Sequence, residues 1–125
     1  MNSAPVFLLV EPSPIVASAL GRWLENVFSN SQIFVASNGA EALQLATENF
    51  PSYILIELSL PDKAGIEILI QLRQALPASR IIATSWFQGR WLIDGARSAG
   101  ADGFILKNKL RNELLPLWGF FQGKG

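Results

Sequence analysis

Short apolar runs alternate along the chain with segments whose apolar residues recur at helical spacing. A brief, continuously apolar run is typical of a strand buried on both faces of a parallel sheet. Apolar residues three and four positions apart mark one face of a helix. The expected strands are 6–10, 32–37, 53–58, 80–85 and 103–107, and the expected helices are 14–28, 38–50, 66–76, 90–99 and 110–121.

The ends of these segments carry suitable boundary residues. Ser13 and Pro14 form a good N-cap and first helical residue. Pro116 lies inside the last helical segment, where proline kinks a helix or ends it early. The second, third and fourth helices stop at Pro51, Pro77 and Gly100.

Five strand–helix pairs in succession predict an α/β fold. Parallel strands need crossover connections, and the right-handed crossover rule leaves few topologies. We expect an α/β, doubly wound, three-layer sandwich, with five helices around a five-stranded parallel sheet. The 125 residues contain no linker or repeat, so residues 1–125 are expected to form one domain without an attached output domain.

Composition removes several classes of function. Ten acidic and ten basic residues cancel. The chain therefore lacks the excess of basic residues that would indicate nucleic-acid binding. The absence of Cys and His excludes disulfides, the usual zinc sites, histidine triads and phosphohistidine chemistry. No targeting signal or long apolar segment is visible, so we expect a cytoplasmic protein without a membrane partner.

Polar residues follow four of the predicted strands, at the sheet edge where ligands bind in such folds. Glu11, Glu57, Ser85 and Lys107 end or follow the first, third, fourth and fifth strands. Each side chain alone is unremarkable at a strand tip. Together they predict that two acids, a hydroxyl and an ammonium converge.

These segments resemble the receiver domain of two-component response regulators over the whole chain. "IELSLPDKAG" follows the family's frame, with Glu57 in the place of the phosphoaccepting Asp. "GADGFILK" matches the segment that ends in the family's Lys, here Lys107, with Phe104 at the switch aromatic. Ser85 matches the Thr or Ser after the fourth strand. The resemblance implies a receiver-like fold of the flavodoxin-like kind, with the strand order 2-1-3-4-5. It also implies a role in a phosphorelay with a sensor kinase or an output protein.

The chain departs from that family at the metal pocket. A competent receiver has two adjacent acids after the first strand, which bind Mg²⁺ with the phosphoaccepting Asp. Here the pair is Glu11-Pro12, and Pro12 offers no carboxylate. Glu11, Pro12 and Ser59 are therefore what remains of the pocket. Mg²⁺ demands near-octahedral oxygen ligation, so we expect weak or absent binding and no resident cofactor.

Two further departures concern the acceptor and access to it. Glu57 is one methylene longer than Asp, and in-line attack tolerates little misplacement. Trp86 stands where the family usually has a small residue, so its indole is expected to block access. With Phe87 and Trp91 it forms an aromatic run that is either an exposed partner surface or a plug filling the lost metal site.

The residues leave several interpretations open. We expect Lys107 to neutralise Glu57 in a partly buried ion pair. Glu57 then either imitates part of a phosphoryl charge or is a relic held by that pair. Glu11 is expected to be a solvated strand-end acid rather than a cation ligand. Ser85 is interpreted as a strand cap rather than a switch, and Phe104 as either packing or a rotating switch.

The resulting hypothesis is a non-catalytic receiver-like module that acts through protein–protein contacts. The alternative is a phosphoaccepting receiver that uses Glu57 with weakly bound Mg²⁺. The sequence has no glycine-rich cradle for a nucleotide or flavin phosphate, and it has no nucleophile elbow of the kind found in hydrolases. The resemblance allows a homodimer through the fourth helix, fifth strand and fifth helix, a face expected to carry Arg97, Asp102, Lys109 and Arg111. Trp118 is expected in the core, and Phe120 with Phe121 at a contact with another chain.

Overall fold

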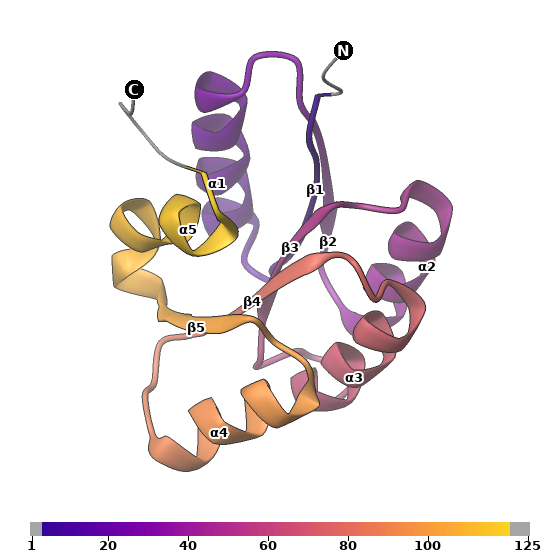
Figure 1. Ribbon diagram of the computed structural model, residues 1–125, viewed down its shortest axis with the longest axis vertical. Helices are drawn as coiled ribbons and strands as arrows, with labels where there is room; N and C mark the ends of the chain where they lie inside the picture. Colours follow the sequence, from indigo (N-terminus) through magenta and orange to yellow (C-terminus); the bar gives the residue numbers. More distant parts are fainter. Residues whose placement is uncertain (1–3, 121–125) are drawn as a thin grey trace.

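The computed structural model describes residues 4–120, which form a parallel sheet between two layers of helices (Figure 1). The strands are β1 (Val6–Val10), β2 (Gln32–Ala36), β3 (Tyr53–Glu57), β4 (Arg80–Ser85) and β5 (Gly103–Leu106). The helices are α1 (Pro14–Val27), α2 (Gly39–Asn49), α3 (Gly65–Ala75), α4 (Arg90–Ala99) and α5 (Leu110–Trp118), with a 3₁₀ turn η1 (Lys107–Lys109). The sheet order is β2-β1-β3-β4-β5, which confirms the predicted α/β fold and topology.

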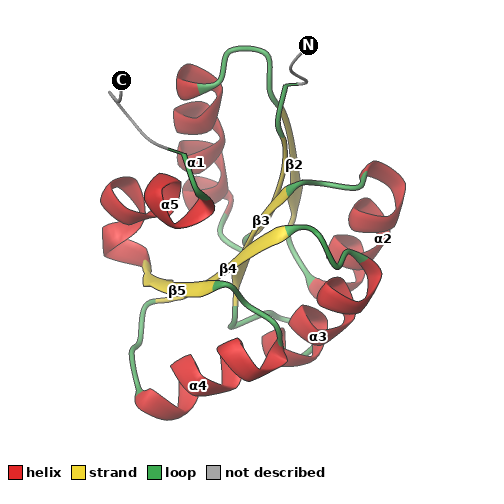
Figure 2. Ribbon diagram, viewed as in Figure 1, coloured by secondary structure: helices red, strands yellow, loops and turns green. Residues whose placement is uncertain are grey.

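The two faces of the sheet bury separate hydrophobic clusters, because neighbouring residues of a strand point to opposite sides. Leu8 and Ile54 pack with α2, α3 and α4 on one face. Phe7 and Leu55 pack with α1 and α5 on the other. Figure 2 shows the same division, with α1 and α5 on one side of the strands and α2 and α3 on the opposite side. Within residues 4–120, no helix is both long and apolar enough to cross a membrane.

The largest differences from the predicted boundaries lie near the C-terminus. The fifth strand ends at Leu106, because Lys107 already begins η1. The last helix continues past Pro116 to Trp118 and ends at Gly119, whose φ of 96° is left-handed. Trp118 is buried as expected, and half-buried Phe120 packs inward on Phe28 at 4.6 Å between ring centroids. Phe121 lies outside the described residues.

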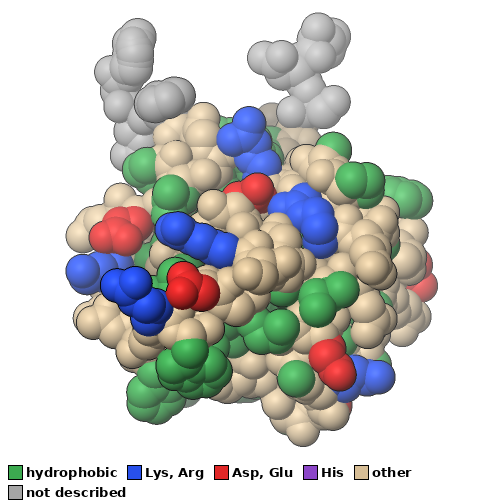
Figure 3. Space-filling model, turned by 60° about the horizontal axis from the view of Figure 1, so that its bottom comes forward, with side chains coloured by type: hydrophobic (Ala, Val, Ile, Leu, Met, Phe, Trp, Pro, Cys, Tyr) green, Lys and Arg blue, Asp and Glu red, His purple; other side chains and the backbone are tan. Residues whose placement is uncertain are grey.

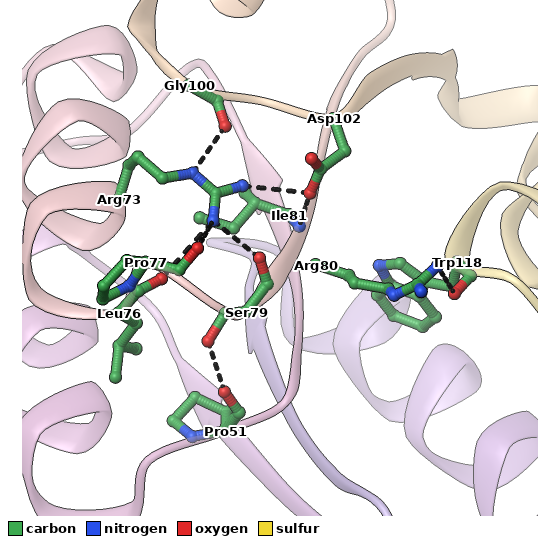
Figure 4. Close-up of polar contacts among 10 residues, drawn as sticks. All are labelled: Pro51, Arg73, Leu76, Pro77, Ser79, Arg80, Ile81, Gly100, Asp102 and Trp118. Carbon is green, nitrogen blue, oxygen red and sulfur yellow. Dashed lines mark hydrogen bonds and ion pairs between the residues drawn. The ribbon is translucent and has the colours of Figure 1, made fainter.

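An arginine binds several groups at the amino ends of the strands, where β4 and β5 begin, on the side of the sheet opposite to the carboxyl ends (Figure 4). Arg73, in the last turn of α3, donates hydrogen bonds to the carbonyls of Ser79 at 2.7 Å and Gly100 at 2.9 Å. It also pairs with Asp102 at 3.0 Å, and Asp102 accepts a bond from the Ile81 amide at 2.7 Å. One guanidinium therefore ties the α3–β4 connection to the α4–β5 connection.

Candidate functional site

The four polar side chains that follow the predicted strands do meet at the carboxyl edge of the sheet. Glu57 and Ser85 are the last residues of β3 and β4, Glu11 directly follows β1, and Lys107 directly follows β5. The Glu11 amide still donates to the Ala36 carbonyl at 2.9 Å, which extends the sheet by one bond. A shallow hollow lies at this edge, and its lining residues are Glu11, Pro12, Ser13, Glu57, Ser59, Ser85, Trp86, Phe87 and Lys107.

A single ammonium joins both carboxylates of the hollow. Lys107 Nζ lies 2.6 Å from Glu11 Oε1 and 2.7 Å from Glu57 Oε1, and all three side chains are only 4% exposed. We call this arrangement the Lys107 bridge. A buried charge is tolerated only where partners replace its hydration, and the bridge provides them within the protein. Among residues 4–120, no three His, Cys, Asp or Glu side chains come together as metal ligands could.

The remaining carboxylate oxygens of the bridge are held by the backbone. Glu11 Oε2 accepts the Ser13 amide at 2.9 Å, and Glu57 Oε2 accepts the Ser59 amide at 2.8 Å. In both cases the donor lies two residues after the acid, where the chain turns out of the strand. Each carboxylate thus faces an ammonium with one oxygen and an amide with the other.

The charge of Lys107 is maintained despite its burial. Burial by itself would lower the pKa of the ammonium, because desolvation disfavours a charged group. Hydrogen bonds and attraction from Glu11 and Glu57 outweigh this effect and raise the pKa above its ordinary value. The ammonium of Lys107 therefore keeps its charge throughout the physiological range.

The expectation that Glu11 is a solvated strand-end acid is wrong. Glu11 is buried and bound to the same ammonium as Glu57, whereas the sequence predicted only the contact between Glu57 and Lys107, which is present. A signal was available in the sequence. Glu11 follows a fully apolar strand as directly as Glu57 ends one, and the parallel ends of β1 and β3 are neighbours in the predicted order.

The aromatic residues beside the site are exposed, so they are not a buried plug. Trp86, Phe87 and Trp91 are 60%, 72% and 79% exposed. Lys107 Nζ lies 5.4 Å from the centre of the Trp86 ring, within reach of a cation–π contact. Figure 3 turns the α4 end of the molecule forward and shows hydrophobic side chains among charged ones on this face. The geometry fits the alternative that these rings form an accessible surface.

The residues matched to the family's switch positions are held by ordinary packing and hydrogen bonds. Ser85 is 2% exposed, and its Oγ accepts the Phe87 amide at 3.1 Å, as a strand cap does. Phe104 is half-buried against the hydrophobic cluster on the α2–α4 side. Thr84, the residue before Ser85, is buried and donates to the Ile105 carbonyl at 2.7 Å, linking β4 to β5.

Comparison with known proteins identifies a large group of relatives. The family profile described as response regulator receiver domain matches residues 7–117. The transcriptional activator protein ExaE of Pseudomonas putida is 33% identical over 100 residues, which are 80% of this chain and 47% of that protein. The chain spans about half the length of the curated relatives that it matches first.

Solved structures give the same result. A two-component response regulator of the LuxR family from Aurantimonas sp. SI85-9A1 superposes with a TM-score of 0.82 at 30% identity, covering 94% of this chain and 88% of that one. A response regulator from Burkholderia pseudomallei, described with a phosphorylated aspartic acid, a calcium ion and citrate, has a TM-score of 0.83 at 25% identity, covering 90% and 66%.

Proposed function

The chain belongs to the response regulator receiver domain family. We propose that it is a receiver that does not accept phosphate in the ordinary way. Its place is in two-component signalling, where receivers interact with kinases and output domains. In this proposal the domain acts through protein–protein contacts and performs no catalysis. Whole relatives such as ExaE are transcriptional regulators by name, so a partner or attached domain that controls transcription suits this role.

The Lys107 bridge is the observation that carries the proposal. A receiver's Mg²⁺ would need oxygen ligands from the ends of β1 and β3, at the place where Glu11 and Glu57 lie. In this chain an ammonium lies within 2.6 and 2.7 Å of both carboxylates, and Pro12 supplies no further anion. Mg²⁺ requires several oxygens at short, near-octahedral distances and gives up its water reluctantly. The residues present do not fit that ion.

The engagement of Glu57 also argues against its action as a nucleophile. Its two oxygens are bound to the Lys107 ammonium and to the Ser59 amide. An attacking carboxylate must turn a free lone pair toward phosphorus in line with the leaving group. Breaking either contact would leave a buried carboxylate oxygen of Glu57 without the partner that replaces its hydration.

A fixed carboxylate at this place has a second consequence. Glu57 holds Lys107 inward with one negative charge, whereas a phosphoryl group carries nearly two. In the proposal, the domain therefore remains in one arrangement that imitates the phosphorylated state in part. Partners then recognise a constant surface, for which the exposed Trp86, Phe87 and Trp91 are suited. A homodimer through α4, β5 and α5 is a second use of the same side of the molecule.

The alternative function is phosphate acceptance by Glu57 with weakly bound Mg²⁺. The observation in its favour is that Glu57 lines a hollow open to solvent. The Burkholderia pseudomallei relative, with its phosphorylated aspartic acid and calcium ion, shows what such a site holds in another member of the family.

Intact-mass measurement after incubation with acetyl phosphate and Mg²⁺ separates the two functions. We expect no mass increase for the wild type, since the residues present do not fit Mg²⁺ and both carboxylate oxygens of Glu57 are already bound. The double variant Pro12→Asp/Glu57→Asp restores both acids and is expected to gain a phosphoryl group. A wild-type gain of one phosphoryl group that disappears in Glu57→Gln would establish the alternative and refute the proposal.

A further inference from the structure

A carboxylate in the loop after β3 binds a distant helix. Asp62 lies between β3 and α3, yet its Oδ1 accepts the Gly39 amide at 2.8 Å and its Oδ2 accepts the Ala40 amide at 3.0 Å. Both amides belong to the first turn of α2, more than twenty residues away in sequence. Those amides lack partners within their own helix, so a carboxylate is a favourable acceptor.

The same helix end also carries a local cap. Asn38 Oδ1 accepts the Glu41 amide at 2.8 Å, as an ordinary N-cap residue does. Asn38 alone would suffice to mark the start of α2. Asp62 satisfies the two remaining amides of the first turn and, unlike Asn38, joins α2 to another segment.

The segment that Asp62 anchors is closely folded and begins at the site. Ser59 forms a bridge with Ala64, and a Cβ on Gly65 would lie 2.3 Å from the Leu58 carbonyl oxygen. Glycine is therefore required for this close approach. The Ser59 amide binds Glu57. Because the Ser59–Ala64 bridge closes the loop that contains Asp62, we expect movement at Asp62 to reach Ser59 as well.

We propose that Asp62 is a strap that holds residues 58–65 against α2 and thereby keeps the Ser59 amide on Glu57. Release of the strap is then the step that frees this loop and loosens one side of the Lys107 bridge. The inference does not depend on whether Glu57 accepts phosphate, since it concerns only how the loop is held.

The ionisation of Asp62 agrees with this geometry. The Gly39 amide is the largest cause that lowers the pKa of the carboxyl below its ordinary value. Burial opposes it, and the Ala40, Asp62 and Lys63 amides add to the lowering. All the stabilising partners are backbone amides. Asp62 is therefore a bound anion at neutral pH.

Amide hydrogen exchange measured by NMR tests the strap, with Asn38→Ala as the matched control. Both Asp62→Ala and Asn38→Ala remove a cap from α2, but only the first cuts the tie to the loop. We expect Asp62→Ala to raise exchange at Ser59 about fivefold relative to Leu55, the factor typical of losing one cap. Leu55, in the middle of β3, reports global opening. Asn38→Ala should leave the ratio of Ser59 to Leu55 unchanged.

Two outcomes would overturn the proposal. Equal changes at Ser59 in both variants would mean that Asp62 acts only through the stability of α2. A change confined to Gly39 and Ala40 would make Asp62 a cap without influence on the site. Asp62→Asn serves where the alanine variant folds poorly, because it keeps the shape, removes the charge and should give a smaller increase at Ser59 in the same direction.

Discussion

Lys107 Nζ lies 2.6 Å from Glu11 Oε1, although β3 and β4 stand between the strands that these residues follow. The lysine side chain thus reaches across the carboxyl edge of the sheet and meets Glu57 on the way. One internal cation connects the ends of β1, β3 and β5. The two carboxylates of the site are thus paired with one ammonium, and the stability of the site depends mainly on that cation.

Removal of the cation should be strongly destabilising. Lys107→Ala leaves two buried carboxylates side by side without a counter-charge, and breaking a buried ion pair in this way typically costs about 3–5 kcal/mol. The free energy of unfolding from urea titration measures the loss. Lys109→Ala, two residues further on at an exposed position, is the control and should change stability little.

Neutralising the acids should relieve that loss. In Glu11→Gln/Glu57→Gln/Lys107→Met, no uncompensated charge remains, so we expect much of the stability lost in Lys107→Ala to return. A Lys107→Ala protein as stable as the wild type would show that the bridge contributes nothing to the fold.

The raised pKa of Lys107 predicts a stability change at high pH. A pKa that is higher in the folded than in the unfolded chain gives stabilisation that is complete below the unfolded value. That stabilisation disappears as the pH rises through the higher, folded value. NMR titration of the Lys107 side chain should locate its pKa above that of an unfolded lysine and show a decrease in Glu57→Gln. An unchanged pKa in that variant would contradict the assigned cause.

Trp86 should add modestly to the stability of the fold through its contact with Lys107. Its ring lies 5.4 Å from the ammonium but is largely exposed, and such cation–π contacts are worth about 0.5–1 kcal/mol. Trp86→Ala should lose about that amount in thermal or urea unfolding, whereas Trp91→Ala, at a comparably exposed position, should be neutral. Combined with Lys107→Met, the effect of Trp86→Ala should vanish. Equal losses in both single variants would point to general packing instead.

Arg73 should matter to stability without affecting the site. Arg73→Ala removes charge-assisted bonds to the carbonyls of Ser79 and Gly100 and to the more exposed carboxylate of Asp102, so a loss of about 1–3 kcal/mol is expected. Arg97→Ala is the matched control, since Arg97 is exposed on α4. Chemical shifts of Ser13 and Ser59 should be unchanged in both variants, because Arg73 acts at the opposite edge of the sheet.

The sequence predicted the layers and the contact of Glu57 with Lys107, because apolar periodicity and strand-end position are local signals, whereas the strand order followed from the resemblance to receiver domains. It did not predict that Glu11 shares the same ammonium. That contact depends on the reach and direction of one lysine side chain past the two strands, β3 and β4, that lie between β5 and β1. The link from Asp62 to α2 was missed for a similar reason, since it joins a loop residue to backbone amides that any sequence would supply.

Titration with Mg²⁺, followed through the amide signals of Ser13 and Ser59, tests the central claim most directly. These amides bind Glu11 and Glu57 and would report any change at either carboxylate. If the Lys107 ammonium holds the place that a metal would need, both signals should stay unchanged at millimolar Mg²⁺, while Pro12→Asp/Glu57→Asp shows saturable shifts. Saturable shifts of both signals in the wild type would contradict the account.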